Sequence, residues 1–249
     1  IAGLIPGIMM ALLFAVYCMG QGYFRKEIKD VEWIGWARCA HAMRRSIWSL
    51  IMPPLVLGGI YMGIFTASEA AAIGSIYALF VGAVIYRNFN LKDLAITAYD
   101  TVRTTSMLFM ILAAAAMFGH AVTIIRLPIE LMESVTAMGL GPIQFILVVM
   151  FVIFILGMFL ETIAIILITT PIVLPALMAF DVNLIWYGIL LMINLELALI
   201  TPPVGMNLFV IKGIANAPLA EVIRGALPYV LLMLIGLTLV LLFEPLALW

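Results

Sequence analysis

Two short stretches of the chain combine helix-breaking residues with polar side chains inside apolar sequence. The first is Gly157-Met-Phe-Leu-Glu-Thr162, which holds one carboxylate and one hydroxyl. The second is Ala198-Leu-Ile-Thr-Pro-Pro203, which holds one hydroxyl and two prolines. Long apolar sequence is typical of membrane segments, and irregular backbone within a membrane persists only where it lines a cavity or binds something. The chemistry that these stretches offer is therefore ion binding by backbone groups.

The prolines of the second stretch remove two hydrogen-bond donors. Pro202 has no N–H, so in a helical register the carbonyl of Ala198 loses its donor. Pro203 has the same effect on Leu199. With the hydroxyl of Thr201, these carbonyls form a cluster of neutral oxygens of the kind that accepts a dehydrated Na⁺. The break is therefore a predicted sodium site.

The first stretch offers similar oxygens, namely the carbonyl near Gly157 and the hydroxyl of Thr162.

The alternative for the second stretch is a simple proline kink packed against neighbouring helices, with Thr201 hydrogen-bonded to its own turn. Because two interruptions of this kind occur in the same part of the chain, we favour the ion site.

The same interruptions present helix N-termini, which carry about half a positive charge and free N–H groups suited to a carboxylate. One is expected at the start of the segment after Thr162, and the other near Pro203. Glu161, at the first break, is a candidate proton carrier, cation ligand or acceptor of backbone N–H bonds.

The elements around the two breaks are short for membrane-spanning helices. Pro142–Leu156 and Ile163–Phe180 have only about 15 to 18 residues each, which is marginal for a bilayer. Leu184–Leu197 and Val204–Ala215 are also short. Paired short segments interrupted by Gly or Pro indicate the binding site of a transporter. The first pair predicts a re-entrant helical hairpin, and the second predicts one broken helix.

The composition is that of an all-α integral membrane protein. Hydrophobic residues make up 66% of the sequence and charged residues 10%, whereas a soluble domain has about 25% charged residues. Clustered Lys and Arg of the kind that bind nucleic acid are absent, so no nucleic-acid partner is expected. Further apolar runs have about the 20 residues that cross a bilayer as a helix. They are Ile1–Tyr23, Thr66–Tyr86, Thr104–Ile125 and Leu227–Phe243.

Charged residues mark the expected loops. Phe24–Arg45 is basic and is predicted to be cytoplasmic, and Arg87–Arg103 is predicted to be a second basic loop on the same side. Ile47–Tyr86 between them predicts a helical pair, interrupted at Gly58-Gly59 and at a polar elbow, Gly63–Glu69. Glu69 is expected to brace this elbow, and Glu196 to brace its own segment.

Four motifs occur in order along the chain: Gly58-Gly-Ile-Tyr-Met-Gly-Ile-Phe-Thr-Ala-Ser-Glu-Ala-Ala-Ala72, Gly157-Met-Phe-Leu-Glu-Thr162, Thr170-Pro-Ile-Val-Leu-Pro175 and Leu199-Ile-Thr-Pro-Pro-Val-Gly-Met-Asn-Leu-Phe209. In these motifs the chain resembles the large membrane subunit of tripartite ATP-independent periplasmic (TRAP) transporters. The resemblance covers essentially all residues. It departs at Ala67, where the family usually has Pro, and at Ala198, where Gly is common.

The resemblance implies an elevator-type secondary transporter with two inverted repeats, each containing a re-entrant hairpin and a broken helix. One repeat is seen here, and we expect the other upstream of Ile1. The implied organisation is a transmembrane helix that ends the preceding repeat (1–23), an amphipathic cytoplasmic segment (24–46), scaffold transmembrane helices (47–140), the transport-domain hairpin and broken helix (141–215), and a C-terminal transmembrane helix (216–249).

The resemblance also implies site residues. The implied sodium-binding positions are Gly157, Ala198, Thr201 and Val204. Two of these residues, Ala198 and Thr201, also lie in the oxygen cluster predicted from the missing donors at Pro202 and Pro203. The candidates for the hairpin tip and the substrate are Glu161, Thr162, Pro202, Pro203 and Asn207.

The implied function is sodium-coupled symport of small organic anions, such as C4-dicarboxylates or sialic acid, across the bacterial inner membrane. Na⁺ is the co-transported ion, and neither an organic cofactor nor enzymatic activity is expected. The implied partners are a small TRAP membrane subunit, a periplasmic substrate-binding protein and a small carboxylate. Two alternatives are a sodium-coupled anion symporter without a binding protein, and a non-transporting membrane scaffold subunit.

Overall fold

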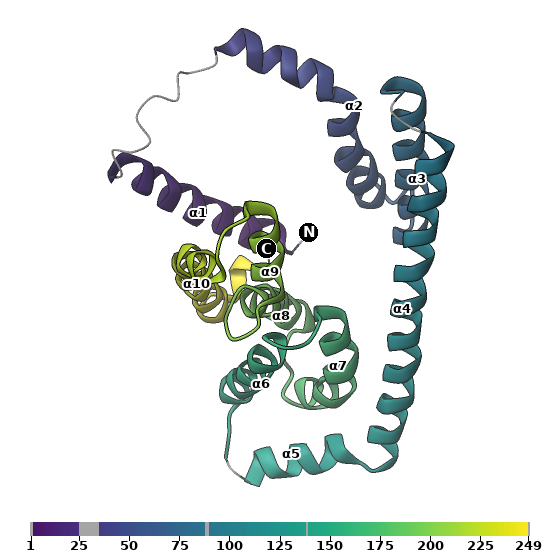
Figure 1. Cartoon of the computed structure of the whole chain (residues 1–249). Coiled ribbons are helices and arrows are strands. Elements are labelled where there is room, and N and C mark those ends of the chain that lie inside the picture. Colours follow the sequence, from purple (N-terminus) through teal and green to yellow (C-terminus); the bar gives the residue numbers. More distant parts are fainter. Residues whose placement is uncertain (1, 25–34, 88–89, 138, 249) are drawn as a thin grey trace. The chain divides into compact units, whose positions relative to one another are not determined.

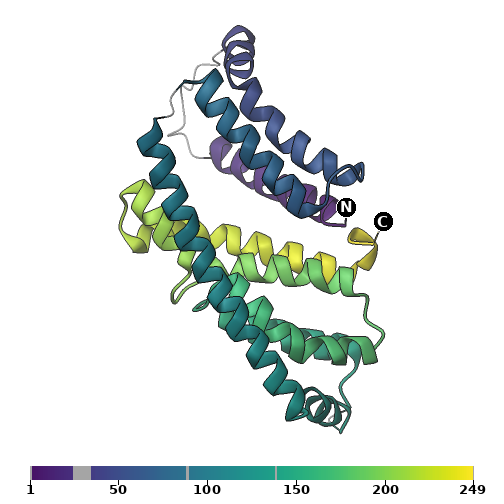
Figure 2. The same ribbon diagram turned by 90° about the vertical axis from the view of Figure 1, so that its right-hand side faces the viewer.

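The computed structural model describes residues 2–24, 35–87, 90–137 and 139–248, and these are helices joined by short loops, with no strand among them. The predicted all-α class is confirmed. The chain divides into two compact units, and Figures 1 and 2 show the helices of both, coloured along the sequence. The smaller unit comprises residues 27–107, and the larger unit comprises residues 1–26 and 108–249.

Several helices confirm the prediction of an integral membrane protein. In the described ranges, five segments are long and apolar enough to cross a membrane. They are Leu4–Tyr23 within α1 (Leu4–Phe24), Ala67–Ile85 formed by α3 (Ala67–Phe80) and the π-helical turn η2 (Val81–Ile85), α4 (Leu91–Ile124), α7 (Thr162–Ala179) and α10 (Leu219–Leu242).

The smaller unit contains the predicted helical pair, α2 (Trp36–Tyr61) and α3, joined by a turn at residues 62–66. The Glu69 carboxylate accepts hydrogen bonds from the N–H and the hydroxyl of Thr66, both at 2.8 Å. The Thr66 hydroxyl in turn accepts the N–H of Glu69 at 3.3 Å. This reciprocal cap stabilises the start of α3, so the predicted bracing role of Glu69 is confirmed.

Two predictions about this part of the chain are wrong. No break occurs at Gly58-Gly59, because α2 continues to Tyr61, and glycine inside a helix costs only about 1 kcal/mol. The predicted basic loop Arg87–Arg103 is helical from Leu91 onward, since charged residues end an apolar run without ending a helix.

The predicted boundary between residues 46 and 47 falls inside α2, and residues 25–34 of the predicted segment 24–46 lie outside the described residues.

The larger unit is built around α8 (Leu184–Leu199), which contacts α6, α7, α9 and α10 (Figure 1). α1 packs along α10, and α5 packs against α7. The remaining helical parts of this unit are residues 108–124 of α4, α5 (Leu127–Ala137), α6 (Pro142–Gly157), α9 (Met206–Ala215) and the short 3₁₀ turn η3 (Glu244–Leu246).

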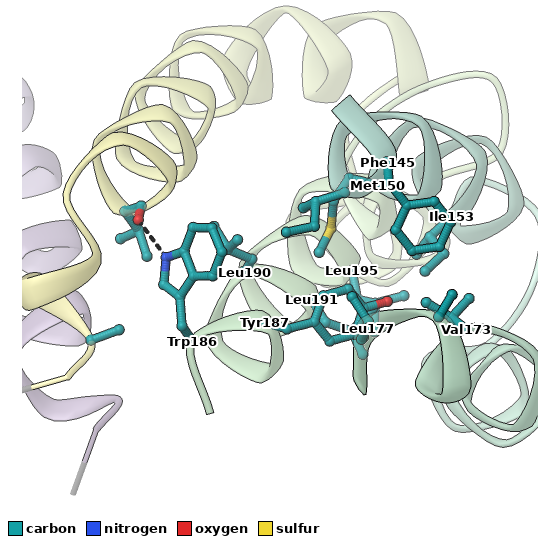
Figure 3. Packing of buried hydrophobic residues seen from close by; sticks show 14 of the residues in the cluster. Phe145, Met150, Ile153, Val173, Leu177, Trp186, Tyr187, Leu190, Leu191 and Leu195 are labelled. Atoms are coloured by element: carbon teal, nitrogen blue, oxygen red, sulfur yellow. Dashed lines mark hydrogen bonds between the residues drawn. The ribbon is translucent and has the colours of Figure 1, made fainter. Parts of the chain in front are cut away.

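The core of the larger unit lies between α6, α7, α8 and α10 (Figure 3). Ile146 of α6 and Leu190 of α8 are fully buried there. The Trp186 Nε1–H donates to the Val240 carbonyl at 2.8 Å and so joins α8 to α10. Because lipid is as apolar as these side chains, close packing and hydrogen bonds, rather than the hydrophobic effect, hold such helices together in a membrane.

Candidate functional site

The predicted hairpin is confirmed as a helix–loop–helix element. α6 ends at Gly157, α7 begins at Thr162, and residues 158–161 form the loop. The Leu160 N–H donates back to the Leu156 carbonyl at 2.9 Å, which closes α6. Among the described residues nothing donates to the Gly157 carbonyl. The free oxygen that the sequence predicts near Gly157 is therefore present.

The predicted broken helix is also confirmed, and its break is longer than a kink. α8 ends at Leu199 and α9 begins at Met206, with residues 200–205 not helical. Across the part of the chain that the structure describes, no backbone N–H or side chain donates to the carbonyls of residues 199–204. These unpaired carbonyls give the break its capacity to bind a cation.

The prediction that the Ala198 carbonyl has no donor is wrong. The Ala198 carbonyl keeps a donor, because the Thr201 N–H reaches it at 3.1 Å in a tighter turn. A carbonyl oxygen has a second lone pair, so this hydrogen bond leaves room for a cation. The Thr201 hydroxyl donates to the Leu197 carbonyl at 2.6 Å, which is the bond expected for the kink alternative. The lone pairs of that hydroxyl oxygen remain available.

The two breaks meet at a close contact between α6 and α8. Gly157 and Ala198 are both buried. A Cβ added at Gly157 would lie 2.6 Å from the Cβ of Ala198, closer than real Cβ atoms approach, so only glycine fits there. We call the pair Gly157 and Ala198 the juncture. The juncture places the C-terminal end of α6, the first helix of the hairpin, against the last turn of α8, just before the break at residues 200–205.

A backbone hydrogen bond reinforces the juncture. The Gly205 N–H, just before α9, donates to the Met158 carbonyl in the hairpin loop at 3.2 Å. Gly205 has φ of +57°, where glycine is favoured. A Cβ at this position would also lie 3.0 Å from the Thr201 carbonyl oxygen. Glycine therefore lets the chain turn tightly from the break into α9.

The other predicted site residues lie around this juncture with differing exposure. Thr201, Pro202, Val204 and Asn207 are half-buried, while Pro203 is exposed. Glu161 and Thr162 of the hairpin are half-buried. The Glu161 side chain does not cap α7. Within the described residues, neither Glu161 nor Asn207 makes a side-chain hydrogen bond.

The helix ends predicted to attract an anion lie at Thr162 for α7 and at Met206 for α9. Each has a first turn whose N–H groups lack helical acceptors. The α9 end begins three residues after Pro203, later than predicted, because the break extends to Gly205. The expectation that Glu196 braces its segment is not met, since its side chain is exposed and forms no hydrogen bond with the described residues.

Sequence reasoning missed Asn194. Its side chain is 2% exposed, and its Nδ2 donates to the Met150 carbonyl of α6 at 2.9 Å. Asn194 is the one amide side chain in the apolar sequence of α8. A polar group within an apolar membrane segment needs a partner, and that signal was available in the sequence.

The sequence profile of the DctM component of tripartite ATP-independent periplasmic transporters matches residues 1–246. The chain is 37% identical to the C4-dicarboxylate TRAP transporter large permease protein of Pseudomonas aeruginosa, and the match covers 96% of this chain and 56% of that protein. It is 32% identical to the 2,3-diketo-L-gulonate TRAP transporter large permease protein of Escherichia coli, covering 98% of this chain and 57% of that protein.

The sialic acid TRAP transporter large permease protein of Vibrio cholerae is 30% identical to the chain, covering 98% of this chain and 57% of that protein. The chain thus spans a little over half the length of the relatives it matches. These relatives are transport permeases and not enzymes. With the family match over nearly every residue, the chain belongs to the DctM family, the large permease component of tripartite ATP-independent periplasmic transporters.

Proposed function

We propose that this chain supplies a sodium-binding hairpin and broken helix to a permease that couples Na⁺ entry to the uptake of small organic anions. The observation that carries this proposal is the juncture. The contact between Gly157 and Ala198 brings two separate interruptions together. Simple proline kinks would require neither a glycine in the facing helix nor the hydrogen bond from Gly205 to the Met158 carbonyl.

The proposed sodium ligands are oxygens of Gly157, Ala198, Thr201 and Val204. The Gly157 and Val204 carbonyls have no donor among the described residues, and the Thr201 hydroxyl retains its lone pairs. Such neutral oxygens bind Na⁺ at unwound helices of transporters. In this proposal α6 and α7 form a re-entrant hairpin, and the hairpin moves with the broken helix as one elevator body.

The proposed substrate is a small organic anion. The free N–H groups at the starts of α7 and α9 suit a carboxylate, and Asn207 in the first turn of α9 adds an amide donor. Glu161, Thr162, Pro202 and Pro203 complete the proposed hairpin-tip and substrate region. The names of the relatives support this class, since they include permeases for C4-dicarboxylates and for sialic acid. The tripartite family supports a small membrane subunit and a periplasmic substrate-binding protein as partners.

The test is uptake into ATP-free proteoliposomes that contain the complete permease complex. We expect an inward sodium gradient to drive uptake of a radiolabelled C4-dicarboxylate, or of another carboxylate from a panel, only when the binding protein is added. Uptake without the binding protein would instead support a simple sodium-coupled symporter. A lack of sodium-driven uptake with every carboxylate and binding protein tested would support a scaffold subunit.

A further inference from the structure

Asn194 of α8 is a buried polar side chain in the larger unit. Among the described residues, it is the one buried residue of the polar or charged types, apart from the aromatic residues Trp186 and Tyr187, which also carry a polar group. Its amide joins α8 to α6 through the Met150 carbonyl at 2.9 Å. An asparagine in a membrane helix is costly, and leucine would fill similar space. Packing alone therefore does not explain why position 194 carries an amide side chain.

The position of this hydrogen bond supplies that reason. Asn194 lies one turn before Ala198 on α8, and Met150 lies two turns before Gly157 on α6. Residues at these spacings share one face of a helix. Asn194 and Ala198 thus lie on one face of α8, and Met150 and Gly157 lie on the face of α6 that packs against it. The bond fixes how far α8 is shifted along α6, and a shift by one residue would be about 1.5 Å.

The juncture tolerates little shift. The Gly157 backbone already contacts the Ala198 Cβ, with Leu195 and Ile165 close beside it. Sodium ligands must be held within about half an ångström of their places. We propose that Asn194 is a positioning residue, which sets the register of α8 on α6 and thereby holds the carbonyls of Gly157 and Ala198 at the spacing that a sodium ion requires. This inference rests on the proposed function of the juncture as a sodium site.

The same helix provides a matched control. Trp186 also makes a buried hydrogen bond from its side chain to a backbone carbonyl, at 2.8 Å to Val240. That bond holds α8 to α10, about three turns of α8 before Ala198. Trp186→Phe removes it and keeps an aromatic ring. Asn194→Leu removes the amide donor and keeps a similar volume. Asn194→Thr, whose hydroxyl can bond within its own turn, is a second variant.

The experiment measures the sodium concentration that gives half-maximal stabilisation of the purified complete permease complex against heating, together with sodium-driven uptake. We expect Asn194→Leu and Asn194→Thr to raise this concentration about three- to fifteenfold, as follows from the strength of hydrogen bonds between membrane helices. Trp186→Phe should lower the melting temperature without changing the sodium concentration required.

Different results test the positioning role of Asn194 and the proposed sodium site separately. An unchanged sodium requirement in a folded Asn194 variant would overturn the positioning role, and so would equal shifts in the Asn194 and Trp186 variants. If Asn194→Leu does not fold, Asn194→Thr decides by the same comparison. An absence of any sodium effect on the wild-type complex would instead contradict the proposed function itself.

Discussion

The Thr201 hydroxyl lies at the point where α8 stops being helical. It donates to the Leu197 carbonyl at 2.6 Å. That hydrogen bond fixes the side-chain rotamer, and a fixed hydroxyl presents its lone pairs in one direction. The hydrogen bond from Thr201 to Leu197 is expected for a simple kink. It is also compatible with a hydroxyl that is already oriented to bind a cation.

Replacing Thr201 with valine tests this role. Thr201→Val keeps the shape of the side chain and removes the hydroxyl, while the Leu197 carbonyl still accepts the Ile200 N–H at 3.3 Å. We expect the sodium concentration for half-maximal uptake to rise about tenfold or more, because interactions of polar groups with charges are worth about 1.5–3 kcal/mol. Thr201→Ser, which keeps the hydroxyl, should remain close to wild type. If both variants keep the wild-type sodium dependence, Thr201 is not a ligand.

Individual residues of the site were partly predictable from the sequence. The loss of donors at Pro202 and Pro203 follows from covalent structure, so a cluster of free carbonyls could be expected there. The sequence did not indicate that the Thr201 N–H would turn back to Ala198. Nor did it indicate the partner of Asn194, because a hydrogen bond between distant segments depends on how helices pack.

At the level of elements, the site depends on how closely α6 approaches α8. An added methyl group at Gly157 would meet the Ala198 Cβ at 2.6 Å, while its contacts to Ile165 and Leu195 would be ordinary, at 3.7 and 3.8 Å. Ala198 is therefore the main obstacle to any larger residue at position 157. The identities of these two residues are coupled through one contact.

Gly157→Ala, alone and combined with Ala198→Gly, tests this coupling. We expect Gly157→Ala to destabilise the complex by about 1–3 kcal/mol, the usual cost of overpacking, and to abolish most sodium-driven uptake. Adding Ala198→Gly should restore uptake, because it removes the clashing Cβ. Melting temperature and uptake would be measured for both single variants and the double variant. Failure of the double variant to improve on Gly157→Ala would show that this contact does not limit the site.

Gly205 provides an independent test of the second link between the breaks. Gly205→Ala places a Cβ 3.0 Å from the Thr201 carbonyl oxygen at a positive φ, so we expect uptake to fall sharply. Gly213→Ala within α9 is a suitable control, because nothing lies within 4 Å of a Cβ there. Equal uptake in the two variants would contradict the importance of the link to Met158.

The elements were more predictable than their contacts. The bounds of α6, α7 and α8 were predicted to within about two residues, because Gly, Pro and polar residues interrupt long apolar runs there. The start of α4 was missed, since its first turns carry charge and resemble a loop. No pattern along the sequence specified that α6 and α8 would meet at Gly157 and Ala198.

For the whole molecule, family membership and the apolar helices place the chain in the bacterial inner membrane as a multi-pass protein. Its matches cover 56–58% of the length of most of the relatives. A carboxylate held near the middle of a membrane must be enclosed from two sides, and many secondary transporters place such a site between two repeats.

We therefore expect that this chain, reconstituted alone, gives no saturable sodium-driven uptake of any carboxylate. A permease of the relatives' full length, assembled with its partners, should give such uptake under the same conditions. The comparison requires proof that the shorter chain has inserted, for example by protease protection of its helices. Saturable uptake by the chain alone would show that the hairpin and broken helix described here suffice for transport.

The most direct test of the central claim is equilibrium binding of radioactive sodium to the purified complete permease, without substrate or transport. We expect saturable binding in the wild type, strongly weakened binding in Thr201→Val and in Gly157→Ala, and recovery when Ala198→Gly is added to Gly157→Ala. Wild-type sodium affinity in the folded Thr201→Val and Gly157→Ala variants would contradict a sodium site at the juncture.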